Sequence, residues 1–153
     1  MERGDVKGIV LGVSLSRRAT DSKENVGRGR LREGQGLEGD AHAGPGERQV
    51  SLLGIESTEE ANRRHGIDAG PGDFAENLTV RGMDLVSLPL GARLRVGKAL
   101  LEVTQIGKPP QASHTYSFRG VSILPTRGIF CRVREGGEVS VGDEITLESE
   151  DDS

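Results

Sequence analysis

Apolar positions along this chain fall into short runs separated by glycine-rich or charged stretches. Short runs rich in Val, Leu and Ile and bounded by Gly, Pro or Asp are typical of β-strands. The runs predicted as strands or extended segments are Val6–Ser14, Gln49–Leu53, Phe74–Val80, Arg93–Val96, Ala99–Thr104, Ile129–Val133, Glu138–Val139 and Glu144–Leu147.

One helix and one tight turn stand out between these runs. Ser57 and Glu60 form an S-x-x-E capping box, which predicts the start of a helix. Gly66 is placed to end that helix as its left-handed C-terminal glycine. Gly97-Lys98 separates two predicted strands, and glycine first in a two-residue loop matches a type II′ hairpin turn.

Many short strands with one or two short helices predict a mostly β fold, a barrel-like antiparallel or mixed sheet. The 153 residues fit one domain, which we expect over residues 1–147. Residues 148–153, Glu-Ser-Glu-Asp-Asp-Ser, are expected to form a disordered acidic tail. Because only 3% of residues are aromatic, the core must consist mainly of Val, Leu and Ile.

The net charge, the apolar segments and the cysteine content limit the kinds of protein that this chain can be. A net charge of -4 argues against general nucleic-acid binding, which leaves a basic footprint. No apolar stretch approaches the roughly 20 residues needed to span a membrane, and the first residues lack the apolar centre of a signal peptide. The expected location is therefore the cytoplasm. Cys131 is the single cysteine, which excludes an intramolecular disulfide.

Basic residues gather in one early segment, 17–36, which the sequence predicts to be a long loop with one short strand near Gly29–Leu31. A local basic surface on an acidic protein suits a small anionic ligand, while a solvated loop is the plainer alternative. The basic residues of this segment are Arg17, Arg18, Lys23, Arg28, Arg30 and Arg32.

The densest polar cluster is the turn Gly39–Gly44, which contains Asp40 and His42. In an extended segment these two side chains face the same way. A metal site could use such a pair, but the chain has three histidines and no cysteine pair, so no dedicated zinc site is expected. The plainer alternative is a turn aspartate bonded to the backbone beside a partly buried histidine.

Two further residues offer groups suited to a polar ligand. Arg48 lies just before a predicted strand, where a guanidinium is a natural fork for phosphate or carboxylate. Its alternative role is a surface ion pair with Glu47 or Glu56. Asn77 offers two donors and an acceptor to a polar ring, or it satisfies the backbone of its own turn.

A third group of candidates lies in the second half of the chain. Lys108 would attract an anion or remain a solvated loop lysine, and Arg127 opens a basic cluster around Cys131. Cys131 alternates with Ile129 and Val133, which predicts a small buried thiol. A functional thiol would need partly exposed, electropositive surroundings, which the neighbouring arginines leave open.

Taken in order, several segments resemble the MOSC domain, the module shared by molybdenum-cofactor sulfurase C-termini and by small stand-alone bacterial proteins. The stand-alone type is the more similar, and the resemblance covers most of residues 6–147. The matching segments are Leu37–Gly44, Arg48–Leu53, Pro71–Thr79, Leu90-Gly91, Ile106–Lys108, Gly128–Phe130 and Val141–Asp143.

This resemblance implies a barrel-like β fold that binds a molybdopterin-type cofactor or handles sulfur destined for a metal centre. Its implied partners are a small anionic pterin and either molybdoenzymes or cofactor-assembly proteins. Family members present a carrier cysteine in the loop after Ile-Gly-Lys, where this chain has Pro109-Pro110. That departure favours cofactor binding over sulfur transfer, and the question of an enzymatic activity stays open.

The resulting hypothesis is a protein that binds molybdenum cofactor and carries it or hands it on. The alternatives are a sulfur transferase that uses Cys131 as its carrier thiol, and a non-catalytic partner-binding module in cofactor assembly. The residues expected to contact the cofactor are Asp40, His42, Arg48, Asn77, Lys108 and Arg127.

Overall fold

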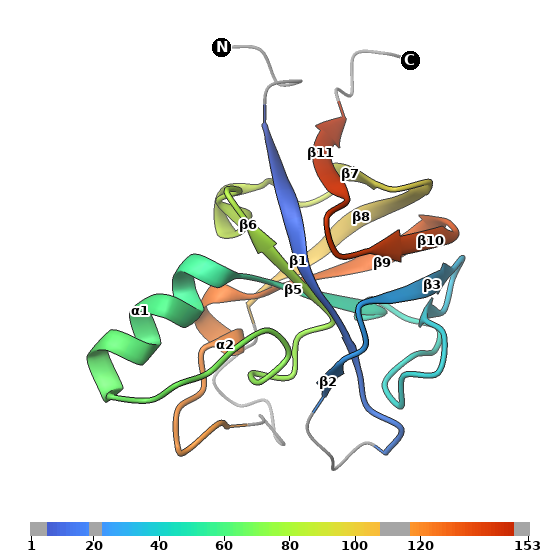
Figure 1. Cartoon of the computed structure of the whole chain (residues 1–153). Coiled ribbons are helices and arrows are strands. Elements are labelled where there is room, and N and C mark those ends of the chain that lie inside the picture. Colours follow the sequence, from blue (N-terminus) through green and yellow to red (C-terminus); the bar gives the residue numbers. More distant parts are fainter. Residues whose placement is uncertain (1–5, 19–22, 108–116, 149–153) are drawn as a thin grey trace.

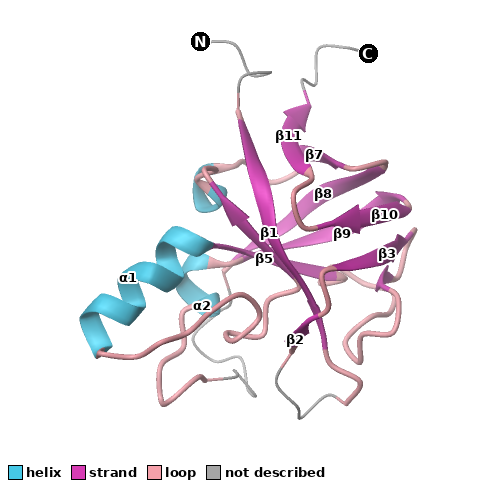
Figure 2. Ribbon diagram, in the orientation of Figure 1, coloured by secondary structure: helices cyan, strands magenta, loops and turns pink. Residues whose placement is uncertain are grey.

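The computed structural model describes residues 6–18, 23–107 and 117–148. Strands make up most of its regular structure (Figure 2). The strands are β1 (Lys7–Leu15), β2 (Glu24–Asn25), β3 (Arg28–Arg32), β4 (Gly36–Leu37), β5 (Val50–Gly54), β6 (Leu78–Arg81), β7 (Arg93–Val96), β8 (Ala99–Ile106), β9 (Ile129–Glu135), β10 (Gly137–Ser140) and β11 (Glu144–Glu148). The helices are α1 (Ile55–His65), α2 (Leu124–Arg127) and the short 3-10 helix η2 (Leu85–Ser87).

Seven strands close into a barrel in the order β11-β7-β8-β9-β5-β6-β1 (Figure 1). The closure is the antiparallel pairing of β1 with β11, in which Lys7 lies opposite Thr146. The β5–β6 pair is parallel and the other pairs of the barrel are antiparallel. The predicted fold class, a barrel-like antiparallel or mixed sheet with one or two short helices, is confirmed: the sheet is mixed.

The barrel interior is filled by aliphatic side chains from alternate strand positions, as the low aromatic content requires. Each fully buried Val, Leu or Ile side chain contributes about 1.5–3 kcal/mol. A second, smaller cluster packs the two helices against the outside of β5 and β9. Its members are Leu53, Ala61, Ala69, Phe74, Leu124 and Phe130.

Helix α1 begins at Ile55, directly after β5, and not at Ser57. The predicted capping box is therefore wrong. The N-cap is Gly54, which has no side chain to bond the helix. The start is set by packing, because Ile55 is buried and the strand passes into the helix without a loop. The carboxylate of Glu56 lies in the first turn, where its negative charge interacts favourably with the positive end of the helix dipole.

The two predicted glycine turns are present. Gly66 ends α1 in the left-handed conformation, with φ 64°, and its N–H bonds the carbonyl of Asn62. Gly97 has φ 56° and opens the two-residue loop between the paired residues Val96 and Ala99. Glycine adopts this conformation without the steric cost that a side chain would bring.

Two segments differ from their predicted structure. In the expected loop over 17–36, the short strand predicted near Gly29–Leu31 is present as β3, but β2 and the start of β4 are two-residue strands that the apolar pattern did not predict. The expected extended segment Phe74–Val80 becomes a strand only at Leu78. Before that point the chain turns, and Ala75 has φ 71°.

Candidate functional site

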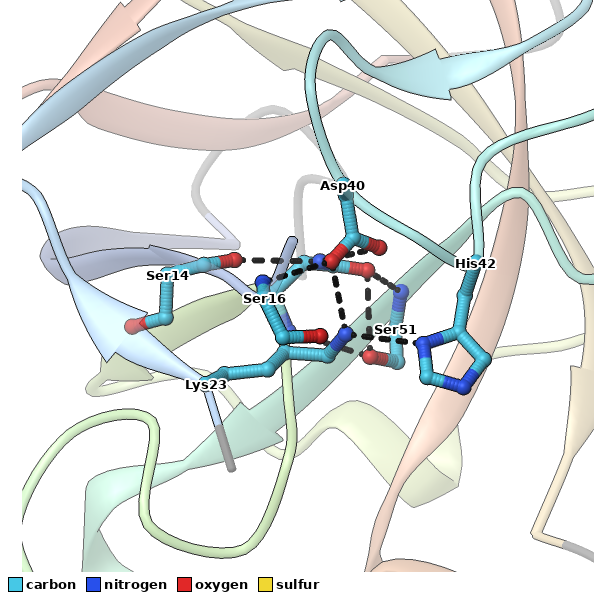
Figure 3. Close-up of polar contacts among 7 residues, drawn as sticks. Ser14, Ser16, Lys23, Asp40, His42 and Ser51 are labelled. Atoms are coloured by element: carbon cyan, nitrogen blue, oxygen red, sulfur yellow. Dashed lines mark hydrogen bonds and ion pairs between the residues drawn. The ribbon is translucent and has the colours of Figure 1, made fainter. Parts of the chain in front are cut away.

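The loop between β4 and β5 brings Asp40 against the C-terminal end of β1 (Figure 3). Its Oδ1 accepts the backbone N–H of Ser16 at 3.0 Å and a hydrogen bond from Lys23 Nζ at 2.8 Å. The predicted role of a turn aspartate that bonds the backbone is therefore present. The lysine partner adds a charge that the turn pattern did not indicate.

Lys23 and Asp40 form a buried ion pair. Their side chains are 4% and 0% exposed. Burial on its own would raise the pKa of Asp40, but the hydrogen bonds from Lys23 and Ser16, with the Lys23 charge, lower that pKa below its ordinary value. The carboxylate is thus held in its charged form inside the protein.

His42 lies at the exposed end of the same cluster. Its Nδ1 is 3.2 Å from Lys23 Nζ, so one ammonium contacts both Asp40 and His42. Figure 3 shows the other ring nitrogen on the side of the imidazole away from Lys23. Both side chains reach Lys23, in agreement with the prediction that Asp40 and His42 face the same way.

Asn77 connects the cluster to the barrel wall. Its Nδ2 donates to Asp40 Oδ2 at 3.2 Å and to the carbonyl of Ser14 at 3.1 Å. Its Oδ1 accepts the N–H of Ser51 at 3.0 Å. These bonds occupy both amide protons and the oxygen, so Asn77 acts as a brace between β1, β5 and the Asp40 loop.

Arg48 lies exposed two residues before the start of β5. Its Nε donates to Gln105 Oε1 at 3.2 Å, and its guanidinium carbon is 5.8 Å from the centre of the Phe130 ring. Gln105 in turn donates to the carbonyl of Gly107 at 2.7 Å. Arg48 is therefore oriented from two sides next to the loop that follows β8.

The carboxylates considered as partners for Arg48 are engaged elsewhere. Glu47 accepts from Arg132 Nη2 at 2.5 Å. Glu56 accepts the backbone N–H of Gly82 at 2.8 Å. Within the described residues Arg48 has no carboxylate partner, which leaves the terminal nitrogens of its guanidinium available to an outside anion.

The Asp40 cluster and Arg48 are connected through residues of β5 and β9. Ser51 on β5 bonds Asn77 on one side and lies opposite Phe130 of β9 on the other. Phe130 in turn lies beneath the Arg48 guanidinium. The structure thus brings Asp40, His42 and Asn77 together through Lys23 and direct hydrogen bonds, and it connects Arg48 to them only indirectly, through Phe130 and Ser51.

The structure does not place Arg127 in this group. Its side chain belongs to α2 and lines a hollow of about 260 Å³ beside the start of α1, together with Gly54 and Ser57. Lys108 and the following Pro109-Pro110 lie outside the described residues.

Cys131 points into the barrel between Val50 on β5 and Val103 on β8. It is 0% exposed. Burial raises the pKa of its thiol, and the negative charge of Glu102 raises it further. These surroundings fit the predicted core thiol and oppose the thiolate that a sulfur carrier needs.

Two buried ionisable residues escaped the sequence prediction. Lys23 belonged to the early basic segment, but nothing local distinguished it from the neighbouring arginines. Glu76 is fully buried, and its Oε2 accepts from the Thr79 hydroxyl at 2.6 Å and from the Gly72 N–H at 3.0 Å. Burial raises the pKa of Glu76 despite these bonds. The only sequence feature that pointed to Glu76 is its position directly before the candidate Asn77.

No group of three or more His, Cys, Asp or Glu side chains is arranged to hold a metal ion in the parts of the chain that the structure describes. None of the helices over those same residues has the length and apolar character needed to cross a membrane.

Comparison with known proteins gives one family and several related folds. The MOSC domain model matches residues 38–146. The solved structure of YuaD from Bacillus subtilis has a TM-score of 0.76 and 24% identity, and the match covers 94% of this chain and 97% of that one. No curated protein sequence matches this chain.

Two structures of YiiM are also similar. The protein from Escherichia coli has a TM-score of 0.68 and 24% identity over 95% of this chain and 71% of that one. The protein from Geobacillus stearothermophilus has a TM-score of 0.66 and 21% identity over 93% and 73%. At these identities the likeness shows a shared fold.

Proposed function

The chain belongs to the MOSC domain family, and we propose that it binds a molybdopterin-type cofactor and carries it or hands it on. Membership of this family supports a role related to the molybdenum cofactor in general. The finer proposal places the cofactor on the outer barrel face between Arg48 and the Asp40–His42 loop.

The observation that carries this proposal is the setting of Arg48. Molybdopterin has a phosphate, and phosphate is recognised by the parallel donors of an arginine fork. Arg48 is held at Nε by Gln105 and lies over Phe130, which orients its terminal nitrogens before any ligand arrives. Such preorganisation lowers the entropy lost on binding.

The opposite edge of this face supplies groups for the pterin ring. His42 is exposed and held by Lys23, while Asp40 and Asn77 are buried beneath it and keep the loop in place. In this proposal Arg48 holds the phosphate and His42 faces the ring. When bound, the cofactor would supply the metal chemistry of whichever enzyme receives it.

The remaining predicted residues enter the proposal differently. Lys108 directly follows Gly107, next to the Gln105 that holds Arg48, so we include it as a second phosphate ligand. Arg127 lines a separate hollow beside α1, and we leave it out. Transfer to molybdoenzymes or to cofactor-assembly proteins is the use we propose for this binding.

Binding is favoured over sulfur transfer by the position of Cys131. A carrier thiol must be deprotonated and reach its acceptor. Cys131 is enclosed by the barrel. The loop after Ile-Gly-Lys, where the family resemblance implies a carrier cysteine, has Pro109-Pro110 in this sequence. A binding role requires neither condition.

The decisive experiment is mass spectrometry of small molecules released from the protein after purification from its own host. We expect a phosphorylated pterin from the unaltered protein and a large loss of it from Arg48→Ala. Arg63→Ala removes an exposed arginine on α1 and serves as the matched control, with retention unchanged. Absence of any pterin from the unaltered protein, or equal retention by Arg48→Ala, would refute the proposal.

A further inference from the structure

We infer that Gln105 is a specificity-determining residue. Its neutral amide holds Arg48 at Nε without cancelling the charge of the guanidinium, so that Arg48 offers its two terminal nitrogens, end-on, to a tetrahedral oxyanion. The inference deepens the proposed function, on which its ligand half rests. Gln105 is a positioning residue here, because it acts on a ligand only through Arg48.

The Gln105 amide bridges a donor and an acceptor. Arg48 Nε–H can only donate, and Nε lies 3.2 Å from Gln105 Oε1. The carbonyl of Gly107 can only accept, and it lies 2.7 Å from Gln105 Nε2. A glutamate at this position would turn an oxygen toward that carbonyl, and a methionine would bond neither group. Among side chains of this length, an amide is the one that satisfies both neighbours.

A bulge in β8 brings Gln105 to this position. The pairing of β8 with β9 shifts register between Val103 and Gln105, so Thr104 is the extra residue. In a regular strand Gln105 would share the face of Val103, which lies in the core. Bulges redirect side chains in this way. Gln105 is only partly buried and reaches Arg48 on the outside of the barrel.

The extra residue of the bulge holds the backbone of the same segment. The Thr104 hydroxyl hydrogen-bonds the carbonyl of Glu47, directly before Arg48, and lies 3.1 Å from the carbonyl of Phe130. Strand β8 therefore holds Arg48 twice, at the preceding backbone carbonyl and at the side-chain Nε. Neither contact uses a negative charge.

The neutral partner distinguishes Arg48 from several arginines on the strands, whose side chains donate to carboxylates. A carboxylate orients a guanidinium as well as an amide does, but it also cancels the positive charge locally. An arginine that binds an outside anion must keep that charge. The carboxylate pairs are Arg32 with Glu38, Arg95 with Glu148, Arg132 with Glu47 and Arg134 with Glu102.

The contact with Gln105 also selects the edge of the guanidinium that a ligand can reach. One fork of a guanidinium combines Nε with a terminal nitrogen, and the other combines the two terminal nitrogens. Gln105 occupies Nε, and the terminal nitrogens have no hydrogen-bond partner among the described residues. Their parallel N–H groups match two oxygens of a tetrahedral oxyanion. The phosphate of a molybdopterin-type ligand and free phosphate share this chemistry.

The orientation of Arg48 can be measured without a ligand, through exchange of its Nε–H proton with water. In the NMR spectrum this proton is assigned by its absence from Arg48→Lys. We expect it to exchange about tenfold more slowly than the Nε–H of Arg63, which is exposed on α1, and Gln105→Met should remove the difference. Equal exchange of Arg48 and Arg63 in the unaltered protein, or full protection in Gln105→Met, overturns the inference.

Titration with inorganic phosphate at about pH 8, where an added glutamate is ionised, tests the neutrality of the amide. Gln105→Met keeps the charge of Arg48 and loses its orientation, so affinity should fall about three- to tenfold. Gln105→Glu keeps a partner for Nε and cancels the charge, so affinity should fall further, by more than about tenfold. Gln35→Glu adds the same charge at an exposed position and should leave affinity unchanged.

The order of these affinities decides the inference. Phosphate binding by Gln105→Glu that equals or exceeds that of Gln105→Met overturns the role of neutrality. Unchanged binding by Gln105→Met overturns the role of orientation, and an equal loss in Gln35→Glu shows that the charge does not act through Arg48. Absence of phosphate binding by the unaltered protein overturns the ligand half.

The source of the phosphate is tested separately, which keeps this inference distinct from the proposed function. A phosphorylated pterin that binds more tightly than inorganic phosphate supports the cofactor as the ligand. Pterin recovered from the unaltered protein, with the affinity order reversed, overturns the inference alone. No pterin from that protein, with the order as expected, refutes the proposed function and supports a free-phosphate site governed by Gln105.

Discussion

Lys23 Nζ donates a hydrogen bond to Asp40 Oδ1 across 2.8 Å, and the two side chains are almost wholly buried. The pair connects the segment before β2 with the loop after β4. Removing two charges from water is costly, and the cost is recovered only while each charge keeps its partner. The contact therefore controls both the stability of this part of the molecule and the setting of His42.

Replacement of Lys23 by Met should lower the free energy of unfolding by about 3–5 kcal/mol, because Asp40 would remain buried without a counterion. The matched control is Arg32→Met, which removes an exposed ion pair with Glu38 at 2.9 Å and should cost no more than about 1 kcal/mol. Urea unfolding of both variants measures the difference. Equal losses would show that burial gives the Lys23 pair no special weight.

Protonation of Asp40 at acid pH should lower the free energy of unfolding. The folded pKa of Asp40 lies below the ordinary value of 3.8, so its contribution is complete above pH 3.8 and is lost as the pH falls through the folded pKa. Asp40→Asn should therefore differ most from the unaltered protein at neutral pH. Denaturation at a series of pH values should show that difference shrinking below pH 3.8. A difference that is independent of pH would be inconsistent with the charged, paired carboxylate.

Glu76 should have the opposite pH dependence, with its contribution to stability falling as the pH rises. Its folded pKa is raised above the ordinary value of 4.5, so its contribution is complete below pH 4.5 and is lost as the pH rises through the folded pKa. Glu76→Gln has no carboxyl proton to lose. Its stability relative to the unaltered protein should therefore increase as the pH rises from 4.5 toward neutrality, measured by the same denaturation series. A decrease over that range would contradict the raised pKa.

The thiol of Cys131 should be inert in the folded protein. It is enclosed between β5 and β8, and burial raises its pKa. A thiol-specific reagent at neutral pH should leave the native protein unmodified and should react fully after denaturation in urea, with mass spectrometry as the readout. Rapid labelling of the native state would return the sulfur-carrier alternative to consideration.

The barrel could be predicted from the sequence because local patterns of residues determine its strands and turns. Alternating aliphatic residues mark the strands, and Gly97 and Gly66 mark a hairpin and a helix end at single positions. The start of α1 was not accessible in this way. Ser57 and Glu60 have the residue types of a capping box, but the packing of Ile55 placed the helix start before them.

The site was only partly accessible. Asp40 and His42 lie two residues apart, so their proximity followed from the chain itself. Lys23 reaches them through tertiary packing of segments that carry no apolar pattern. Arg127 has the right charge for a phosphate, yet α2 packs beside α1 and directs it into another hollow. Residue types identified candidates for a binding site, but tertiary packing determines which of these side chains lie close together.

The pairing of β1 with β11 has a practical consequence for handling this protein. Lys7 lies opposite Thr146 at one end of β1, whereas Ser14 and Ser16 reach the Asp40 cluster at the other end (Figure 1). The intervening strand spans roughly 20 Å. A probe attached to Lys7 or Thr146 would therefore lie at the end of the barrel remote from the Asp40 cluster.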